Sequence, residues 1–456
     1  MTRVLIDSCE VVVTMDDLGT EISGGSILIE DGLVSWVGSG RPEDAEGAEV
    51  VEGRGGVALP GLVNAHHHLF QSLTRVRAQD QGLFGWLKEL YPVWAGLDAE
   101  WARAAAMVGL AELALSGCST TTDHHYVFPA GAPGLLEAEI EAAGRIGLRF
   151  HPCRGSMDLG RSAGGLPPDS VIQDIDTILA GTEDAVRRFH NPAPGSMVRV
   201  AVGPCSPFTA SERLMRESDE LARRLGVRVH THIAETLDEE AFCREQFGRR
   251  PLEFLDDLGL LGPGTWLAHC VHLNEKDIRR VAETGTTVAW CPTSNLRLGS
   301  GIAPARALID EGVPVGLGVD GSASNDAGSL VAEAKQAMLV ARAGGDPGAL
   351  TGREALRLAT RGGAACLGRG DIGSIEPGRR ADIALFDVEG LPFSGAEADL
   401  VASVIHCGPR GVRDLFVEGR PVVRGGSLTG ADQAAVAREG RRIGARIADG
   451  SWGTSG

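Results

Sequence analysis

Hydrophobic and polar residues alternate in short runs over the first 60 positions. The stretches RVLIDSCEVVVTM, GGSILIEDGLVSWVGSG and AEVVEGRGGVALP are rich in β-branched residues, are separated by glycine and aspartate, and show no helical period. Short period-two runs bounded by turn residues are typical of β-strands. The pattern therefore predicts a strand-rich unit over residues 1–60.

The hydrophobic pattern changes after Gly61. Between residues 61 and 368, short apolar runs such as RVAVGPC and TTVAWCP alternate with longer helical patterns such as SERLMRESDELARRLG. Apolar strands that alternate with helices indicate a parallel sheet that is covered on both faces. About eight such units fit between Gly61 and Asp320, which favours a closed (β/α)8 TIM barrel over an open sheet.

Strand patterns return after residue 368. The segments GSIEPGRRADIALFDV and ASVIHCGPRGVRDLFVEGRPVVRGG precede a final helical stretch. Because both strand-rich ends flank the predicted barrel, we expect them to pair into one small β-sandwich. The predicted class is thus α/β, with a hydrolase barrel over 61–368 and a β-sandwich from 1–60 and 369–456, the latter including a closing helix.

Composition and charge narrow the classes of partner. The 456 residues carry a net charge of -18 with a pI near 5.1, which argues against nucleic acid or an anionic membrane surface. No apolar window approaches about 18 residues, and the N-terminal residues lack a signal-peptide pattern. The nine cysteines form no CxxC pair and are typical of reduced thiols. We expect a cytoplasmic protein with no membrane or nucleic-acid partner.

Ligand-type residues recur where the predicted barrel strands end. In LVNAHHHLF, strand alternation places His66 and His68 on one face, which suits two imidazoles on one divalent ion. The ends of the fifth, sixth and eighth strands add His230, His232, Glu235, His269, His272 and Asp320. Each alone has an ordinary explanation as a hydrogen-bonded polar residue or a turn. Together, at the face where barrels keep their active sites, they predict a metal site.

These motifs also carry a family resemblance. The segments LPGLVNAHHHLFQ, HTHIAET, LAHCVHL, GLGVDGSASN and GSIEPGRRADIALFD resemble the amidohydrolase superfamily, in its aminohydrolase branch of nucleobase, pterin and triazine deaminases and hydrolases. The resemblance covers essentially the full chain. It implies a distorted (β/α)8 barrel with a β-sandwich formed by both chain ends, and a dimer, because such barrels commonly form homo-oligomers.

The resemblance implies a role for each matching position. The implied metal ligands are His66, His68, His232 and Asp320. Glu235 matches the proton-shuttling glutamate of the family, and His269 matches its strand-six histidine. The fourth strand, VRVAVGPCSPF, lacks the lysine that bridges two metals in binuclear members. We therefore expect one divalent metal ion, zinc, with iron as the alternative.

The expected chemistry is hydrolytic deamination. Water bound to the ion would ionise near neutral pH, and Asp320 and His269 would hold and deprotonate it. The hydroxide would add to a ring carbon that carries an amino group. Glu235 would protonate the adjacent ring nitrogen and then the departing amine.

The substrate pocket is expected to involve residues near these motifs. The candidate substrate-binding residues are Gln71, Trp94, His125, Arg154 and Cys205. Gln71 falls where related deaminases bond the heterocycle, and His125 ends the second strand together with His124. The aromatic residues of QDQGLFGWLKELYPVWAGL either pack a helix on the barrel or form a lid that stacks on a flat ring.

The fourth strand also bears on the choice of ring. Guanine deaminases have Pro-Arg-Phe where this chain reads Pro204-Cys205-Ser206-Pro207-Phe208. The segments HPCRGSMDLGRSAGGLPPDS, GPCSPFTASERLMRESDELAR and CPTSNLRLGSGIAP resemble 8-oxoguanine deaminases, which implies conversion of 8-oxoguanine and water to urate and ammonia. Isoxanthopterin or another pterin, guanine, and amino- or chloro-s-triazines remain alternatives.

Two other classes of protein are less compatible with the sequence. A non-catalytic member of the superfamily would lack some of the ligands, whereas this chain has all four together with Glu235. A metal-dependent amidase that acts on a cyclic amide is favoured by the bridging lysine, which this chain does not have.

Overall fold

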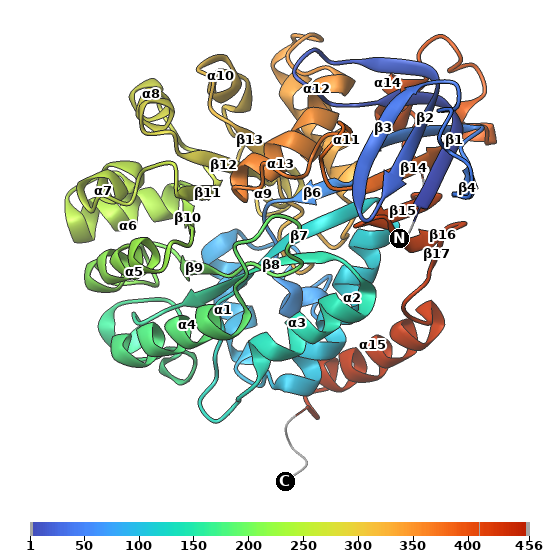
Figure 1. The fold of residues 1–456 in the computed structure, drawn as a ribbon. Coiled ribbons are helices and arrows are strands. Elements are labelled where there is room, and N and C mark those ends of the chain that lie inside the picture. The colour runs from blue at the N-terminus through green and yellow to red at the C-terminus, as the bar shows by residue number, and fades with distance from the viewer. Residues whose placement is uncertain (1–2, 410, 453–456) are drawn as a thin grey trace.

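Eight parallel strands form the centre of the molecule in a computed structural model that describes residues 3–409 and 411–452 (Figure 1). They are hydrogen-bonded in chain order, so each strand lies beside the next along the sequence. The strands are β6 (Leu62–Asn64), β7 (Cys118–His125), β8 (Arg149–Ser156), β9 (Ala201–Pro204), β10 (Val229–Ile233), β11 (Thr265–His269), β12 (Thr287–Trp290) and β13 (Val315–Leu317).

Hydrogen bonds between the first and last of these strands bring the sheet nearly to closure. The amide of Ala65 donates to the carbonyl of Leu317 at 2.8 Å. The amide of Val319 donates to the side-chain oxygen of Asn64 at 2.9 Å. The predicted barrel, in the distorted form that the family resemblance implies, is therefore confirmed.

Helices surround the barrel, as the alternating pattern predicts (Figure 1). The sequence marks their ends: Ser211 caps α5 by accepting from the amide of Leu214, and Gly226 ends it with φ +67°. These helices are α2 (Ala99–Leu115), α3 (Leu135–Ile146), α4 (Ile175–Phe189), α5 (Glu212–Leu225), α6 (Leu237–Phe247), α7 (Pro251–Asp257), α8 (Glu275–Thr284), α9 (Pro292–Arg297), α10 (Ala305–Asp310), α11 (Leu330–Ala341), α12 (Gly352–Arg357) and α13 (Gly363–Cys366).

A second sheet combines the two ends of the chain. Strand β14 (Ile383–Asp387) pairs antiparallel with β5 (Gly56–Pro60), so that C-terminal and N-terminal strands form one nine-stranded mixed sheet. The other strands are β1 (Arg3–Val13), β2 (Glu21–Glu30), β3 (Leu33–Ser39), β4 (Glu49–Glu52), β15 (Asp414–Val417), β16 (Arg420–Arg424) and β17 (Ser427–Leu428). The prediction that both chain ends pair into one separate β domain is confirmed; the strands of the predicted β-sandwich are hydrogen-bonded along one continuous mixed sheet.

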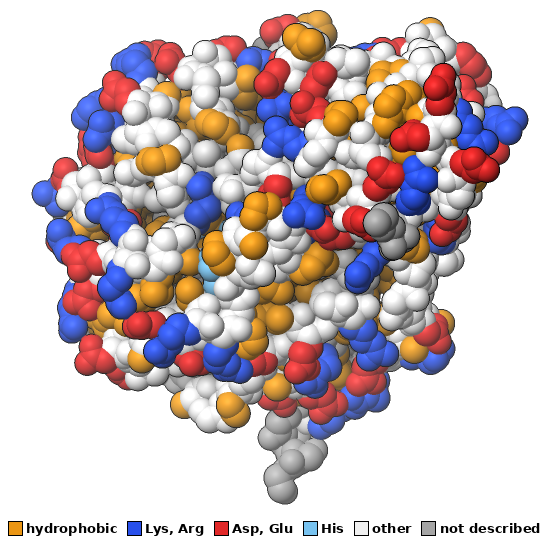
Figure 2. All heavy atoms as spheres, in the orientation of Figure 1, with side chains coloured by type: hydrophobic (Ala, Val, Ile, Leu, Met, Phe, Trp, Pro, Cys, Tyr) orange, Lys and Arg blue, Asp and Glu red, His pale blue; other side chains and the backbone are white. Residues whose placement is uncertain are grey.

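Three further helices complete the fold. Helix α1 (Leu83–Trp94) lies over the barrel, α14 (Leu400–His406) lies near the second sheet, and α15 (Gln433–Ala448) packs along α2 (Figure 1). Basic and acidic side chains are interspersed over the face that Figure 2 shows. No helix among residues 3–409 and 411–452 is long and apolar enough to span a membrane.

Candidate active site

A small cavity of about 40 Å³ lies at the carboxyl ends of the barrel strands, beneath α1. Its walls combine the predicted ligand-type residues with aromatic and aliphatic side chains. The lining comprises His68, Gln71, Leu83, Trp86, Leu87, Tyr91, Tyr126, Cys205, Ser206, Phe208, His232, Glu235, His269, Leu298, Asp320 and Ser324. Leu83, Trp86, Leu87 and Tyr91 of α1 form part of this wall, so α1 covers one side of the cavity.

A chain of hydrogen bonds fixes the protonation of His66. The Nδ1 of His230 lies 2.8 Å from the carbonyl of Trp266, so it carries the hydrogen and leaves Nε2 as an acceptor. That Nε2 lies 2.8 Å from the Nδ1 of His66, which must therefore donate. The buried Nε2 of His66 is left with a lone pair and has no hydrogen-bond partner among the described residues.

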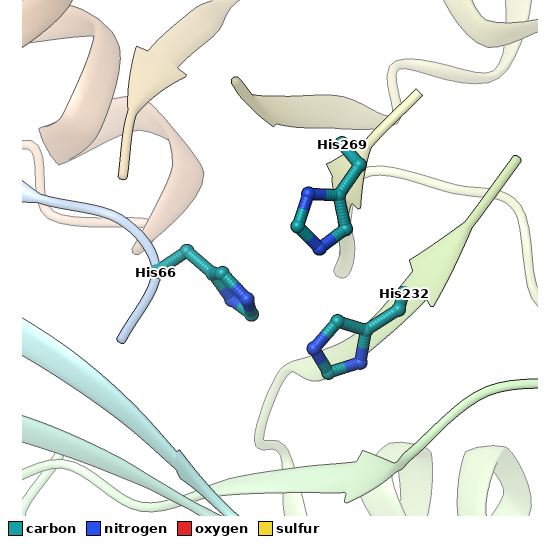
Figure 3. Close-up of side chains that lie close together, drawn as sticks. All are labelled: His66, His232 and His269. Atoms are coloured by element: carbon teal, nitrogen blue, oxygen red, sulfur yellow. The ribbon is translucent and has the colours of Figure 1, made fainter. Parts of the chain in front are cut away.

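The same logic applies to His68 and His232. Their Nδ1 atoms donate to the carbonyls of His124, at 2.8 Å, and Cys205, at 2.7 Å. Both Nε2 atoms therefore present lone pairs, and they lie 3.1 Å from each other. Figure 3 shows that His232 on β10, His269 on β11 and His66 just after β6 point toward a common centre.

Asp320 completes this cluster. Its Oδ1 lies 3.4 Å from the Nε2 of His66 and 3.3 Å from that of His68. Its Oδ2 accepts from the hydroxyl of Ser294 at 2.6 Å. Burial opposes ionisation of this carboxyl, whereas the hydrogen bond from Ser294 favours the carboxylate. Asp320 thus supplies a negative charge beside three imidazole lone pairs.

Glu235 and His269 face each other across the same cavity. The Oε2 of Glu235 lies 3.6 Å from the Nε2 of His269, and its Oε1 accepts from Ser300 at 3.5 Å. Burial, followed by the charges of Asp320 and Glu239, raises the pKa of Glu235 well above its usual range. Burial therefore favours the protonated form of Glu235 more than it is favoured in an exposed glutamate.

Backbone strain accompanies two of these positions. His269 and Asp320 adopt φ values of +72° and +61°, in the left-handed region that non-glycine residues rarely occupy. His269 is the last residue of β11 and Asp320 lies three residues beyond β13, and both side chains line the cavity at the barrel mouth. Strain of this kind concentrates at functional sites.

Comparison with known proteins places this geometry in a family. The model of the amidohydrolase family matches residues 57–422. The chain belongs to the amidohydrolase family. Like the predicted fold, the expectation of a deaminase-type hydrolase is thereby confirmed at the level of the family.

Named relatives of this amidohydrolase act on several rings. An 8-oxoguanine deaminase from Pseudomonas aeruginosa is 45% identical, over 96% of this chain and 97% of that protein. An isoxanthopterin deaminase from an unknown prokaryotic organism is 35% identical, over 94% and 93%. The crystal structure of an atrazine chlorohydrolase from Arthrobacter aurescens TC1 complexed with zinc has a TM-score of 0.93 at 33% identity, covering 97% of this chain and all of that one.

The donor set of the amidohydrolase site fits a divalent metal. Two sets of potential ligand atoms each lie within 4.8 Å of one another: His66, His68 and Asp320, and His66, His232 and His269. Metal-binding histidines characteristically donate their second ring N–H to a carbonyl or another acceptor, as His66, His68 and His232 do. A metal ion bound here would be a partner for the Nε2 of His66, which is buried without a hydrogen bond.

The structure brings only some of the predicted substrate-binding residues to the cavity. Gln71 and Cys205 line it. Trp94 is buried behind the wall and donates from Nε1 to the hydroxyl of Thr74 at 3.2 Å. Arg154 donates to the carbonyl of Gly155 and to the side chain of Gln173, and its guanidinium stacks on Phe128. Neither Trp94 nor Arg154 is among the lining residues.

His125 likewise lies outside the cavity lining. Its Nε2 lies 3.0 Å from the carbonyl of Val127, and its Nδ1 lies 2.8 Å from Glu139 on α3. Its neighbour His124 points the other way, because successive side chains on a strand alternate. The His124 ring lies 4.9 Å from that of His232. The histidine of this pair that faces the cluster is therefore His124.

Tyr126 is an aromatic lining residue that sequence reasoning missed. Tyr126 follows the two histidines in TTTDHHYVF and packs edge-on against His68, with 4.9 Å between the ring centroids. It shares the parity of His124 along the strand, which is the signal that could have identified it.

Proposed function

We propose that the protein is a deaminase with one divalent metal ion that converts 8-oxoguanine and water to urate and ammonia. His66, His68, His232 and Asp320 would hold the ion, with zinc the expected metal. The observation that carries the proposal is the convergence of three imidazole lone pairs and a carboxylate beside the buried carboxyl group of Glu235. A bound divalent ion lowers the pKa of a coordinated water to about 7.

The residues of the chain account for the proton transfers. Water adds to C2, the ring carbon that carries the amino group. One of the two protons of this water is taken up by Asp320, which holds the water together with His269. Glu235 donates its proton to the neighbouring ring nitrogen. Glu235, now deprotonated, takes the proton of the new C2 hydroxyl and passes it to the amino group, which leaves as ammonia. The proton held by Asp320 then returns to Glu235, so that one water is consumed and one ammonia is released.

The cavity wall supports a flat heterocyclic substrate. Trp86 and Tyr91 of α1, together with Phe208, provide aromatic surface, and Cys205 stands where the sequence of guanine deaminases has arginine. The similarity to the Pseudomonas aeruginosa 8-oxoguanine deaminase supports this ring over the others. Closure of α1 over the ring would exclude bulk water from the reaction.

Ammonia release from a panel of rings tests the proposal. The purified protein, with its metal content measured, would be assayed with 8-oxoguanine, guanine, isoxanthopterin, cytosine and an amino-s-triazine. We expect the highest kcat/KM with 8-oxoguanine. Preference for another ring would overturn the substrate and keep the reaction, whereas no ammonia from any ring would overturn deamination.

Replacement of Glu235 tests the proton transfers separately. The variant Glu235→Gln keeps the shape of the side chain but cannot cycle a proton. We expect kcat to fall at least about 100-fold, within the range for general acid–base catalysis, with the metal content unchanged. Metal analysis and steady-state kinetics on the same preparation measure both. A variant with wild-type turnover would remove Glu235 from the mechanism.

A further inference from the structure

The chain has only two tyrosines, and both line the cavity. Tyr91 comes from α1 and Tyr126 from the end of β7, and both are almost completely buried. A buried tyrosine usually finds a partner for its hydroxyl. The hydrogen bonds of these two hydroxyls therefore show which of them is free to contact a substrate.

The two tyrosine hydroxyls differ in whether they have a hydrogen-bond acceptor. The hydroxyl of Tyr91 donates to the thioether of Met157, with 3.6 Å between oxygen and sulfur. The hydroxyl of Tyr126 accepts from the Nε2 of Gln71 at 3.2 Å. Within residues 3–409 and 411–452, no acceptor is found for the hydrogen of Tyr126. Tyr126 therefore presents an unused donor at the cavity wall.

Gln71 presents the complementary group beside it. Its Nε2 is committed to Tyr126, and its Oε1 is buried without a hydrogen-bond partner among the described residues. The side chain also has little freedom to move, because the Cα of Gly321 lies against it: a Cβ added there would approach Oε1 to 1.9 Å. The wall thus holds an acceptor and a donor next to each other in a fixed arrangement.

An adjacent acceptor and donor match a ring edge on which an N–H lies beside a C=O. A 2-aminopurin-6-one has this lactam edge at N1 and C6, directly next to the carbon that loses its amino group. A 2,6-diaminopurine has the same amino group at C2 but offers a bare nitrogen and an amine at that edge. A ring that leaves these buried polar groups of the protein unpaired binds much more weakly, so the pair discriminates strongly between the two kinds of ring.

We propose that Tyr126 is a specificity-determining residue that donates to the lactam oxygen of the substrate while Gln71, which positions it, accepts from the adjacent ring N–H. The inference rests on the proposed deaminase function and narrows its substrates to 2-amino lactam rings. Gln71 alone could contact such an edge with its own amide. Here its Nε2 instead holds Tyr126, whose hydroxyl takes over the role of donor.

Two matched substitutions test the role of Tyr126. Tyr126→Phe and Tyr91→Phe each remove one hydroxyl from the same cavity and keep the ring. The substrates are 8-oxoguanine and its analogue 2,6-diamino-8-oxopurine. For Tyr126→Phe we expect kcat/KM to fall about 10- to 100-fold with 8-oxoguanine, mainly through KM, and far less with the diamino analogue. Tyr91→Phe is expected to change both by the same small factor.

The outcomes separate this proposal from the proposed function. An equal loss for both rings in Tyr126→Phe would overturn the role of Tyr126 even if deamination of 8-oxoguanine is established. If the wild type deaminates neither ring, the proposed function fails. The role of Tyr126 is then tested by the affinity of the protein for urate. Urate keeps the lactam edge and has no amino group to lose, so its affinity for the zinc-loaded protein can be measured by calorimetry without turnover.

We expect urate to bind the Tyr126→Phe protein about 10-fold more weakly than the wild type and the Tyr91→Phe protein with nearly unchanged affinity. Circular dichroism of each variant would show that the fold is retained. Equal affinities of wild type and Tyr126→Phe, or no binding of urate by the wild type, would overturn the proposal.

Discussion

Individual residues around the site act mainly by fixing other residues. His230 is not among the residues that line the cavity, yet its bond to the carbonyl of Trp266 decides which nitrogen of His66 has a free lone pair. A metal site depends on such partners nearly as much as on its ligands. The surroundings of Glu235 show the same dependence.

Glu239 positions the backbone that carries Glu235. Its two carboxylate oxygens accept from the amides of Ala234 and Glu235, each at 2.8 Å, and Ala234 adopts a strained φ of +51°. In Glu239→Gln an amide NH2 would face one of these donors. We expect kcat to fall about 10-fold with the metal content unchanged, measured by kinetics and metal analysis. Glu245→Gln, at an exposed position on the same helix, is the control and should match the wild type.

Glu139 gives the protein a pH-dependent stability. Its carboxyl is buried against His125, and burial raises its pKa to about 8, against about 4.3 in an unfolded chain. The folded state therefore retains a proton that the unfolded state loses. The stabilisation is complete below about pH 4.3 and is lost as the pH rises through 8.

The variant Glu139→Gln mimics the protonated form and removes this dependence. His125 donates from Nε2 to the carbonyl of Val127, so its Nδ1 can accept from the amide of the new side chain. We expect Tm of the wild type to fall more steeply than that of the variant between pH 6 and 9. Thermal melts of the metal-free proteins at several pH values measure this. Parallel curves would contradict the assigned pKa.

At the scale of strands and helices, the sequence predicted which side chains share a face. It did not predict which of the two faces points into the barrel. Alternation predicted that His66 and His68 share a face at the end of the first barrel strand; β6 ends earlier, at Asn64, but both side chains still turn toward Asp320. Alternation could not decide between His124 and His125, because the parity of a strand does not say which face is inside. That choice depends on the pairing of β7 with β6, whose register shifts between Leu62 and Val63.

The helices and loops show the same limit. The aromatic pattern of residues 79–97 left packing and lid as alternatives, and α1 does both: Trp86 and Tyr91 line the cavity, whereas Trp94 lies in the core behind it. The rotation of α1 on the barrel, which the sequence does not encode locally, separates these roles. The same is true of Arg154, which tertiary contacts with Gln173 and Phe128 draw away from the cavity.

One buried side chain contributes to the closure of the barrel, together with the backbone bond between Ala65 and Leu317. Asn64 on β6 accepts from the amide of Val319 at 2.9 Å and donates to the hydroxyl of Thr121 on β7 at 3.0 Å. Asn64→Ala would leave a buried amide and a buried hydroxyl without these partners. We expect the free energy of unfolding to fall by about 2–4 kcal/mol. Urea denaturation measures it, and a loss below about 0.5 kcal/mol would show that closure does not depend on Asn64.

At the scale of the whole molecule, the barrel and the second sheet are joined by a buried charge network. Arg149 at the start of β8 donates to both oxygens of Asp382, at 2.6 and 2.9 Å, and to Glu418 next to β15. The amide of Glu418 in turn donates to Asp382 at 2.9 Å. Asp382 directly precedes β14, the strand that links the two ends of the chain. The network therefore ties the barrel to the C-terminal strands of the second sheet.

Removal of Arg149 should weaken this junction strongly. Arg149→Met keeps much of the side-chain volume but leaves the carboxylate of Asp382 buried without its cation. Breaking one partner of a buried ion pair costs about 3–5 kcal/mol, because the remaining charge is left in a poorly solvated place. We expect the urea midpoint to fall accordingly and the double variant Arg149→Met with Asp382→Leu to recover part of the loss. The control is Arg188→Met, which removes an exposed arginine paired with Glu137 and should leave the urea midpoint almost unchanged. An equal fall of the midpoint in Arg149→Met and Arg188→Met would show that the buried network stabilises the protein no more than an exposed ion pair does.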